Sequence, residues 1–104
     1  MGDADKDNYK EQDKATMAII ATTTKDGVDA RLSADFQIDV GKVYYTVSCA
    51  GYTFEFGEFA LAARVYKTFS RRIEMGMTKG IDVLVRNVAS AVRVMGYAVK
   101  GGAQ

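Results

Sequence analysis

Apolar and polar residues alternate without a break from Val28 to Val40. A period of two is typical of a strand with one buried face and one wet face. Asp26-Gly27 precedes this run and suits a type I′ turn, and Gly41-Lys42 follows it and suits a type II′ turn. The pattern predicts a three-stranded antiparallel meander with residues 28–40 as its central strand.

The two turns predict registers that align apolar residues on one face. Around the first turn, one face holds Thr23, Ala21, Ile19, Met17, Ala30, Leu32, Ala34 and Phe36. Around the second turn, the predicted pairs are Val40 with Val43, Ile38 with Tyr45, Phe36 with Val47, and Ala34 with Cys49. The phase slips at Ala50-Gly51, which predicts a bulge or bend, and the inward residues that follow are Tyr52, Phe54 and Phe56.

The apolar period changes to about 3.6 after Glu58, and this predicts an amphipathic helix as far as Met75. Gly76 is placed for a left-handed cap at the helix end. A second apolar stripe runs from Ile81 to Val99 and predicts another helix. Its valines favour strands, so Ile81–Val85 is an alternative fourth strand.

These elements predict an α+β fold in which two amphipathic helices cover the apolar face of a meander, giving a two-layer sandwich. Residues 15–104 are long enough, and at 48% hydrophobic residues overall apolar enough, for a single domain. Residues 1–14 are polar and mostly acidic and are predicted to form an N-terminal arm. Cys49 is the only cysteine, so we expect a buried thiol and no intramolecular disulfide.

Residue types argue against an enzyme. Histidine is absent, which removes the commonest general base and metal ligand, and no phosphate-binding loop, nucleophile elbow or metal-ligand spacing occurs. We therefore expect no cofactor and no metal. Asp29, Asp35 and Asp39 recur on the wet face of the predicted central strand, and this pattern is more typical of a solvated sheet surface than of paired catalytic carboxylates.

Charge is divided unevenly along the chain. Residues 1–60 hold six Lys/Arg and eleven Asp/Glu, whereas residues 61–104 hold eight and two. Arg64, Lys67 and Arg71 share one face of the first predicted helix. Arg86, Arg93 and Lys100 on the second predicted helix are candidates to extend that basic face. Such a face either solvates the covering helices or binds an acidic partner or a phosphate backbone.

Three hypotheses of function follow. The leading one is a small non-enzymatic regulatory or inhibitory protein that binds another protein through the acidic sheet residues (Asp29, Asp35, Asp39) or the basic helical residues (Arg64, Lys67, Arg71). The alternative is a nucleic-acid-binding protein using Arg64, Lys67, Arg71, Arg86 and Arg93. A third is an assembly subunit in which acidic and basic faces of successive copies meet.

Location and oligomeric state are also predicted. The longest apolar runs fall well short of the ~20 residues that cross a bilayer, so we expect no membrane contact and a cytoplasmic protein. The predicted meander leaves Met17–Lys25 and Val43–Phe56 as edge strands with unpaired backbone groups. Pairing of such an edge with a second copy would satisfy those groups, which favours a homodimer.

Overall fold

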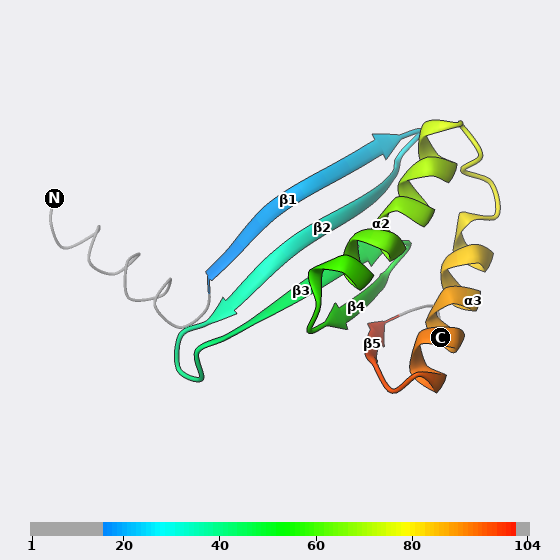
Figure 1. The fold of residues 1–104 in the computed structure, drawn as a ribbon. Coiled ribbons are helices and arrows are strands. Elements are labelled where there is room, and N and C mark those ends of the chain that lie inside the picture. Colours follow the sequence, from blue (N-terminus) through cyan, green and yellow to red (C-terminus); the bar gives the residue numbers. More distant parts are fainter. Residues whose placement is uncertain (1–15, 102–104) are drawn as a thin grey trace, which may run out of the picture.

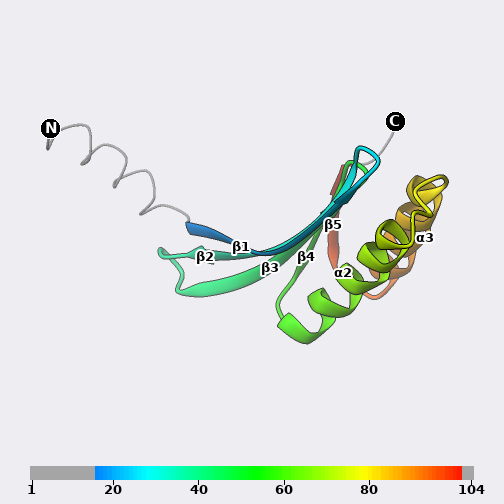
Figure 2. The same ribbon diagram turned by 90° about the horizontal axis from the view of Figure 1, so that it is seen from above.

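A computed structural model of the chain describes residues 16–101, so the predicted N-terminal arm, residues 1–14, lies outside the described part. Five strands form one antiparallel sheet in the order of the chain, and two helices lie side by side on one of its faces (Figures 1 and 2). The elements in order are β1 (Thr16–Lys25), β2 (Val28–Gln37), β3 (Lys42–Cys49), β4 (Tyr52–Phe56), α2 (Phe59–Glu74), α3 (Ile81–Val94) and β5 (Ala98–Gly101).

The predicted α+β class is confirmed, and the number of strands is corrected from three or four to five. The segment predicted as a single third strand, Val43–Phe56, is divided by a tight turn into β3 and β4. At that turn Ala50 and Gly51 both have positive φ, 51° and 81°, which is the backbone of a two-residue hairpin. The phase slip noted in the sequence is therefore a chain reversal rather than a bulge.

The core lies between the sheet and the helices. The inward residues of β4, Tyr52, Phe54 and Phe56, are all buried, as predicted. The helices contribute the buried side chains of Ala62, Val65, Phe69, Ile73, Ile81, Val85, Ala89 and Val92. Their spacing of three and four residues is the stripe that predicted both helices.

The first helix ends as its sequence predicts. Met75 is the C-cap, and Gly76 follows with φ 76°. The Gly76 N–H donates to the Ile73 carbonyl and the Met77 N–H donates to the Arg72 carbonyl, at 2.9 Å each. This pair of bonds is a Schellman motif, which satisfies the last carbonyls of α2.

The second helix is shorter than predicted. The Gly96 N–H donates to the Arg93 carbonyl and the Tyr97 N–H donates to the Val92 carbonyl, so another Schellman motif ends α3 at Val94. The chain then enters β5, in which Val99 pairs with Phe54. Val99 was predicted on the helical stripe and instead lies on a strand. Residues 81–85, the alternative fourth strand, are helical.

Two pairing registers also differ from the prediction. The β2–β3 turn spans residues 38–41 and closes where the Gly41 N–H donates to the Gln37 carbonyl at 2.9 Å. Phe36 consequently pairs with Val43 and not with Val47, a slide of four residues that leaves the inward face unchanged. Ile38, Asp39 and Val40 lie in the turn rather than on the strand.

The register of β1 follows the prediction only near its turn. Thr23 pairs with Ala30 and Ala21 with Leu32, as expected, but an irregularity at residue 20 then shifts the register. Beyond it, Ile19 pairs with Ser33 and Met17 with Asp35. A single extra residue in one strand reverses which face the following side chains take. Met17 and Ile19 therefore lie on the outer face, opposite to the prediction.

Candidate functional site

The sheet extends beyond its helical cover at one end. Strands β1 and β2, with ten residues each, span about 33 Å at the usual rise. Helix α2, with 16 residues, spans about 24 Å and α3 less. The helices lie over the end of the sheet that holds the Asp26-Gly27 turn, and the other end projects past them (Figure 2). The inward apolar face of the sheet is therefore longer than the two helices that cover it.

We call the projecting end the distal tip, defined by its exposed large apolar residues. They are Met17, Ile19, Ile20, Phe36, Ile38, Val40 and Val43. Their exposed fractions run from 39% at Phe36 to 59% at Met17, whereas Phe54 at the covered end is 0% exposed. Clustered exposed apolar side chains of this kind mark interaction surfaces in folded proteins.

The boundary of the tip is set by the start of α2. The Phe59 ring packs edge-on against Tyr45 of β3, with ring centroids 5.5 Å apart. Tyr45 is half-buried by this contact, while Val43, two residues further out on the same face, is 40% exposed. The cover over the inward face therefore ends between these two positions, whereas Met17 and Ile19 are exposed on the outer face, which the two helices do not cover.

Charged residues surround the tip. Asp35 is half-buried on the outer face of β2, opposite Met17 and Tyr44 in the pairing. Asp39 is exposed in the β2–β3 turn, and exposed Lys42 begins β3. An apolar centre with a polar rim is the usual composition of a protein interface.

The three predicted acidic residues do not share one surface. Asp29 lies at the covered end of β2, six residues from Asp35, and six strand residues span about 20 Å. Asp39 is in the turn. The outer face also carries Arg31, Lys42, Glu55 and Lys100, and the Lys100 ammonium lies 3.7 Å from a Glu55 carboxylate oxygen. The outer face as a whole is balanced in charge rather than acidic.

The predicted basic residues are all exposed on the helical layer. Arg64, Lys67 and Arg71 follow one another along α2. The Arg93 guanidinium donates to the Val99 carbonyl at 3.4 Å, and Arg86 borders a small hollow beside Tyr52. The α3 arginines are thus turned towards β4 and β5. The basic residues form a stripe on α2 and a separate pair on α3.

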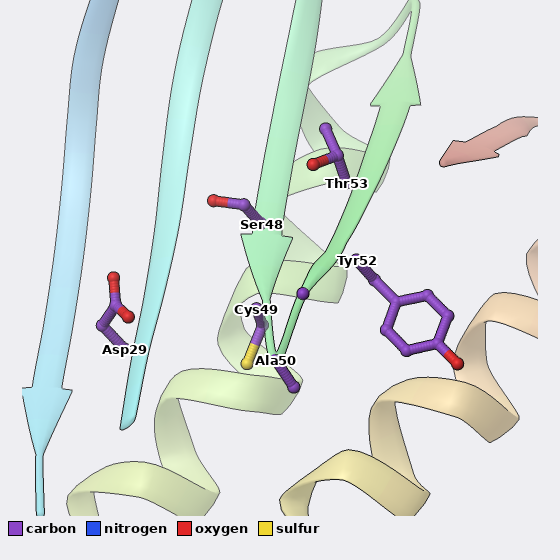
Figure 3. A pocket seen from close by; sticks show the side chains of 7 residues that line it. Asp29, Ser48, Cys49, Ala50, Tyr52 and Thr53 are labelled. Atoms are coloured by element: carbon purple, nitrogen blue, oxygen red, sulfur yellow. The ribbon is translucent and has the colours of Figure 1, made fainter. Parts of the chain in front are cut away.

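A hollow of about 200 Å³ lies beside the β3–β4 turn, at the covered end of the sheet (Figure 3). Its lining consists of Asp29, Ser48, Cys49, Ala50, Gly51, Tyr52 and Thr53. Cys49 points its sulfur towards the helices in Figure 3. The hollow is smaller than the roughly 300–1,000 Å³ of ordinary ligand pockets.

The Cys49 thiol is unsuited to nucleophilic chemistry. Burial, and secondarily the negative charge of Asp29, raise the pKa of this thiol from 9.0 to about 11. A thiol must lose its proton to act as a nucleophile, so Cys49 is inert near neutral pH. Within residues 16–101, no three acidic, cysteine or histidine side chains come together as a metal site.

The raised pKa of Cys49 predicts a loss of stability at alkaline pH. The unfolded thiol ionises near pH 9.0, while the folded thiol keeps its proton up to about pH 11. The unfolded state binds fewer protons across this window, so the free energy of unfolding falls as the pH rises through it. Urea denaturation of wild type and Cys49→Ala at several pH values measures how much of this pH dependence is due to the Cys49 thiol. The fall should be steeper in wild type, and equal slopes would contradict it.

Comparisons with known proteins identify no family: no family model, no curated protein and no solved structure matches the chain. Within residues 16–101, neither helix is long and apolar enough to cross a membrane.

No pattern along the sequence predicts the distal tip. The alternation from Val28 to Val40 predicts an apolar face that is buried along its whole length. The lengths of the predicted elements carry the missing signal, because two helices of this size leave part of a long sheet uncovered.

Proposed function

We propose that this chain is a small non-enzymatic regulatory or inhibitory protein that acts by binding another protein, and that the distal tip is its contact surface. The observation that carries the proposal is that seven of the thirteen exposed large apolar residues in the described part of the chain lie in the half of the sheet that holds the β2–β3 turn. Burying such a surface in a partner is favourable by roughly 25 cal/mol per Å² of apolar area.

The chemistry of the tip defines the kind of partner. Its centre is apolar on both faces of the sheet and around the β2–β3 turn, so it fits a concave apolar surface. On the rim the two carboxylates of Asp35 and Asp39 outnumber the single ammonium of Lys42, which favours a partner with basic residues at the edge of that concavity. Of the acidic residues predicted from the sequence, these two remain in the proposed contact, and Asp29 is remote from it.

The polar segment that precedes β1 is a poor candidate to cover the tip. Residues 1–15 contain only Met1, Ala4, Tyr9 and Ala15 as apolar residues. Their sequence offers little apolar area to set against seven exposed side chains. This favours a separate molecule over residues 1–15 as the occupant of the tip.

Affinity capture with the full chain as bait tests the proposal. Cross-linking in an extract of the source organism should retain a protein partner on wild type and lose it when the tip is made polar. Equal recovery by wild type and a folded tip variant would exclude the tip as the contact.

The charge of the helical layer favours a second candidate, nucleic-acid binding. Residues 58–95 carry seven Lys/Arg against three Asp/Glu, and Arg64, Lys67, Arg71, Arg86 and Arg93 are all exposed. Such side chains can neutralise phosphates without reading the base sequence. The division of the basic residues between two helical surfaces makes this the weaker candidate.

A salt titration of binding to single- and double-stranded oligonucleotides tests this second candidate. If the α2 stripe contacts three phosphates, the logarithm of the binding constant should fall with the logarithm of salt with a slope near −2 to −3. Arg64→Ala should weaken binding and reduce the slope by about 1. A lack of binding at low salt would eliminate this candidate.

The cytoplasmic location inferred from the sequence stays a prediction.

A further inference from the structure

The two edges of the sheet differ in how they are protected. Strand β5 is four residues long, carries Lys100, and ends at Gly101 with φ 85°. Short length and an edge lysine are common devices against strand pairing. Strand β1 is ten residues long and pairs on one side only, with β2. Within residues 16–101, β1 is therefore the long open edge.

The sequence of β1 leaves that edge almost unguarded. From Met17 to Thr24 it contains neither a charged residue nor a proline, and it is rich in isoleucine and threonine. Such residues favour strands. The register irregularity at residue 20 is its one interruption. An edge of this length and composition is a template for pairing with another strand.

The hairpin fixes which backbone groups face outward. Asp26 and Gly27 form a two-residue turn, with φ of 54° and 77°, between the paired residues Lys25 and Val28. The pair that flanks such a turn exchanges hydrogen bonds, and pairs then alternate along the ladder. The N–H and C=O groups of Thr22 and Thr24 consequently point to the open edge, and those of Thr23 point to β2.

We propose that β1 pairs with β1 of a second copy, antiparallel and about a two-fold axis near the middle of the strand, to form a continuous ten-stranded sheet. A two-fold contact is closed, so it satisfies both long edges at once and leaves only the short β5 edges free. The same segment pairs with itself in such a contact.

The charges of β1 fit self-pairing. Lys25, at the end of the strand, is its only charged residue. With the axis near the strand centre, the two Lys25 side chains lie at opposite ends, about 30 Å apart, and no like charges face each other near the axis. The threonines of one copy oppose the apolar half of β1 in the other, and β-branched residues suit both sides of such a ladder.

This dimer rests on the β1 edge and shares Met17, Ile19 and Ile20 with the distal tip, but it leaves the side chains of Phe36, Ile38, Val40 and Val43 free to bind the partner of the proposed function. The two distal tips then lie on either side of the two-fold axis and point in opposite directions along the strands. Each dimer would then present two tips.

Sedimentation across a wide range of protein concentration tests the dimer. Wild type should sediment as a dimer and dissociate on dilution. Thr22→Pro removes an outward N–H and puts the proline ring in the path of the second strand, while the hydrogen bonds to β2 remain. We expect its dimer dissociation constant to rise at least about tenfold, with an unchanged circular dichroism spectrum. Thr22→Val keeps the N–H and should remain dimeric.

Two further readouts distinguish this contact from others. Phe36→Ser, at the tip, should leave the dimer intact, so a dimer that dissociates with Phe36→Ser and survives Thr22→Pro would overturn the proposal. Should Thr22→Pro fail to fold, amide hydrogen exchange of wild type decides. The Thr22 and Thr24 amides should be protected at high concentration and exchange faster on dilution. A wild-type monomer at all concentrations, or exchange independent of concentration, would also overturn it.

Discussion

Replacing Phe54 with alanine should lower the free energy of unfolding by about 3–5 kcal/mol. Phe54 is 0% exposed, and its ring lies 5.6 Å from that of Phe69 in α2 and 6.3 Å from that of Phe56, centroid to centroid. The truncation leaves a cavity where the sheet meets its helical cover. Stabilities of small domains are about 5–15 kcal/mol, so this change removes a large part of the total.

Phe36→Ala is the matched control, because it makes the same truncation at the distal tip. Phe36 is 39% exposed, and its loss should lower the free energy of unfolding by about 1 kcal/mol or less. Urea denaturation of the two variants beside wild type measures the difference. Equal losses would show that the tip is packed as tightly as the core, contrary to the fold described above.

Making the tip polar should abolish partner binding without unfolding the protein. Ile38 and Val40 lie in the β2–β3 turn and are 46% and 57% exposed. Aspartate is well suited to turns, so Ile38→Asp and Val40→Asp should leave the fold intact. Placing a carboxylate in a desolvated apolar contact should weaken binding by at least about 2 kcal/mol, or roughly thirtyfold.

Val94→Asp is the control for the tip variants. Val94 ends α3 and is 89% exposed, so the substitution makes the same chemical change on the helical layer, away from the tip. Binding measured by calorimetry with the captured partner should be unchanged in this variant. If Val94→Asp weakened binding as much as Val40→Asp does, the added negative charge would be the cause of the weaker binding, whatever its position, and the tip would not be the contact surface.

The sequence predicts which face of each strand is buried more reliably than it predicts the pairing. Alternation fixes the face of Phe36, but a slide of four residues keeps that face, so the pattern cannot choose between Val43 and Val47 as its partner. The β2–β3 turn decides the pairing. It spans residues 38–41, with Gly41 at φ 64°, and is longer than the two-residue turn that Gly41-Lys42 predicts.

The sequence does not predict the fifth strand, because the apolar residues of β5 continue the period of α3. Val92, Met95 and Val99 fit one helical stripe, yet Gly96 lies between them with φ 96° and ends the helix. A glycine inside an apolar stripe is a recognisable stop signal. The sequence does not predict that the four residues of β5 pair with the edge of β4.

The charged candidates were predicted from local spacing, which is only part of what makes a surface. Asp29 and Asp35 share a face, but neighbouring strands bring Lys42 and Lys100 onto it. Likewise, Arg64 lies on the α2 stripe, whereas Arg86 on α3 borders a hollow beside Tyr52 of β4. The tip exists because the strands are longer than the helices that cover them, and the pattern of no single segment predicts it.

Oxidative footprinting of the free protein and of its complex with the captured partner tests the role of the tip most directly. Phe36 should be oxidised readily in the free protein and become protected in the complex. Met75, which is 69% exposed at the end of α2, should be oxidised equally in both. Protection of Met75 with unchanged oxidation of Phe36 would contradict the proposal that the distal tip is the contact surface.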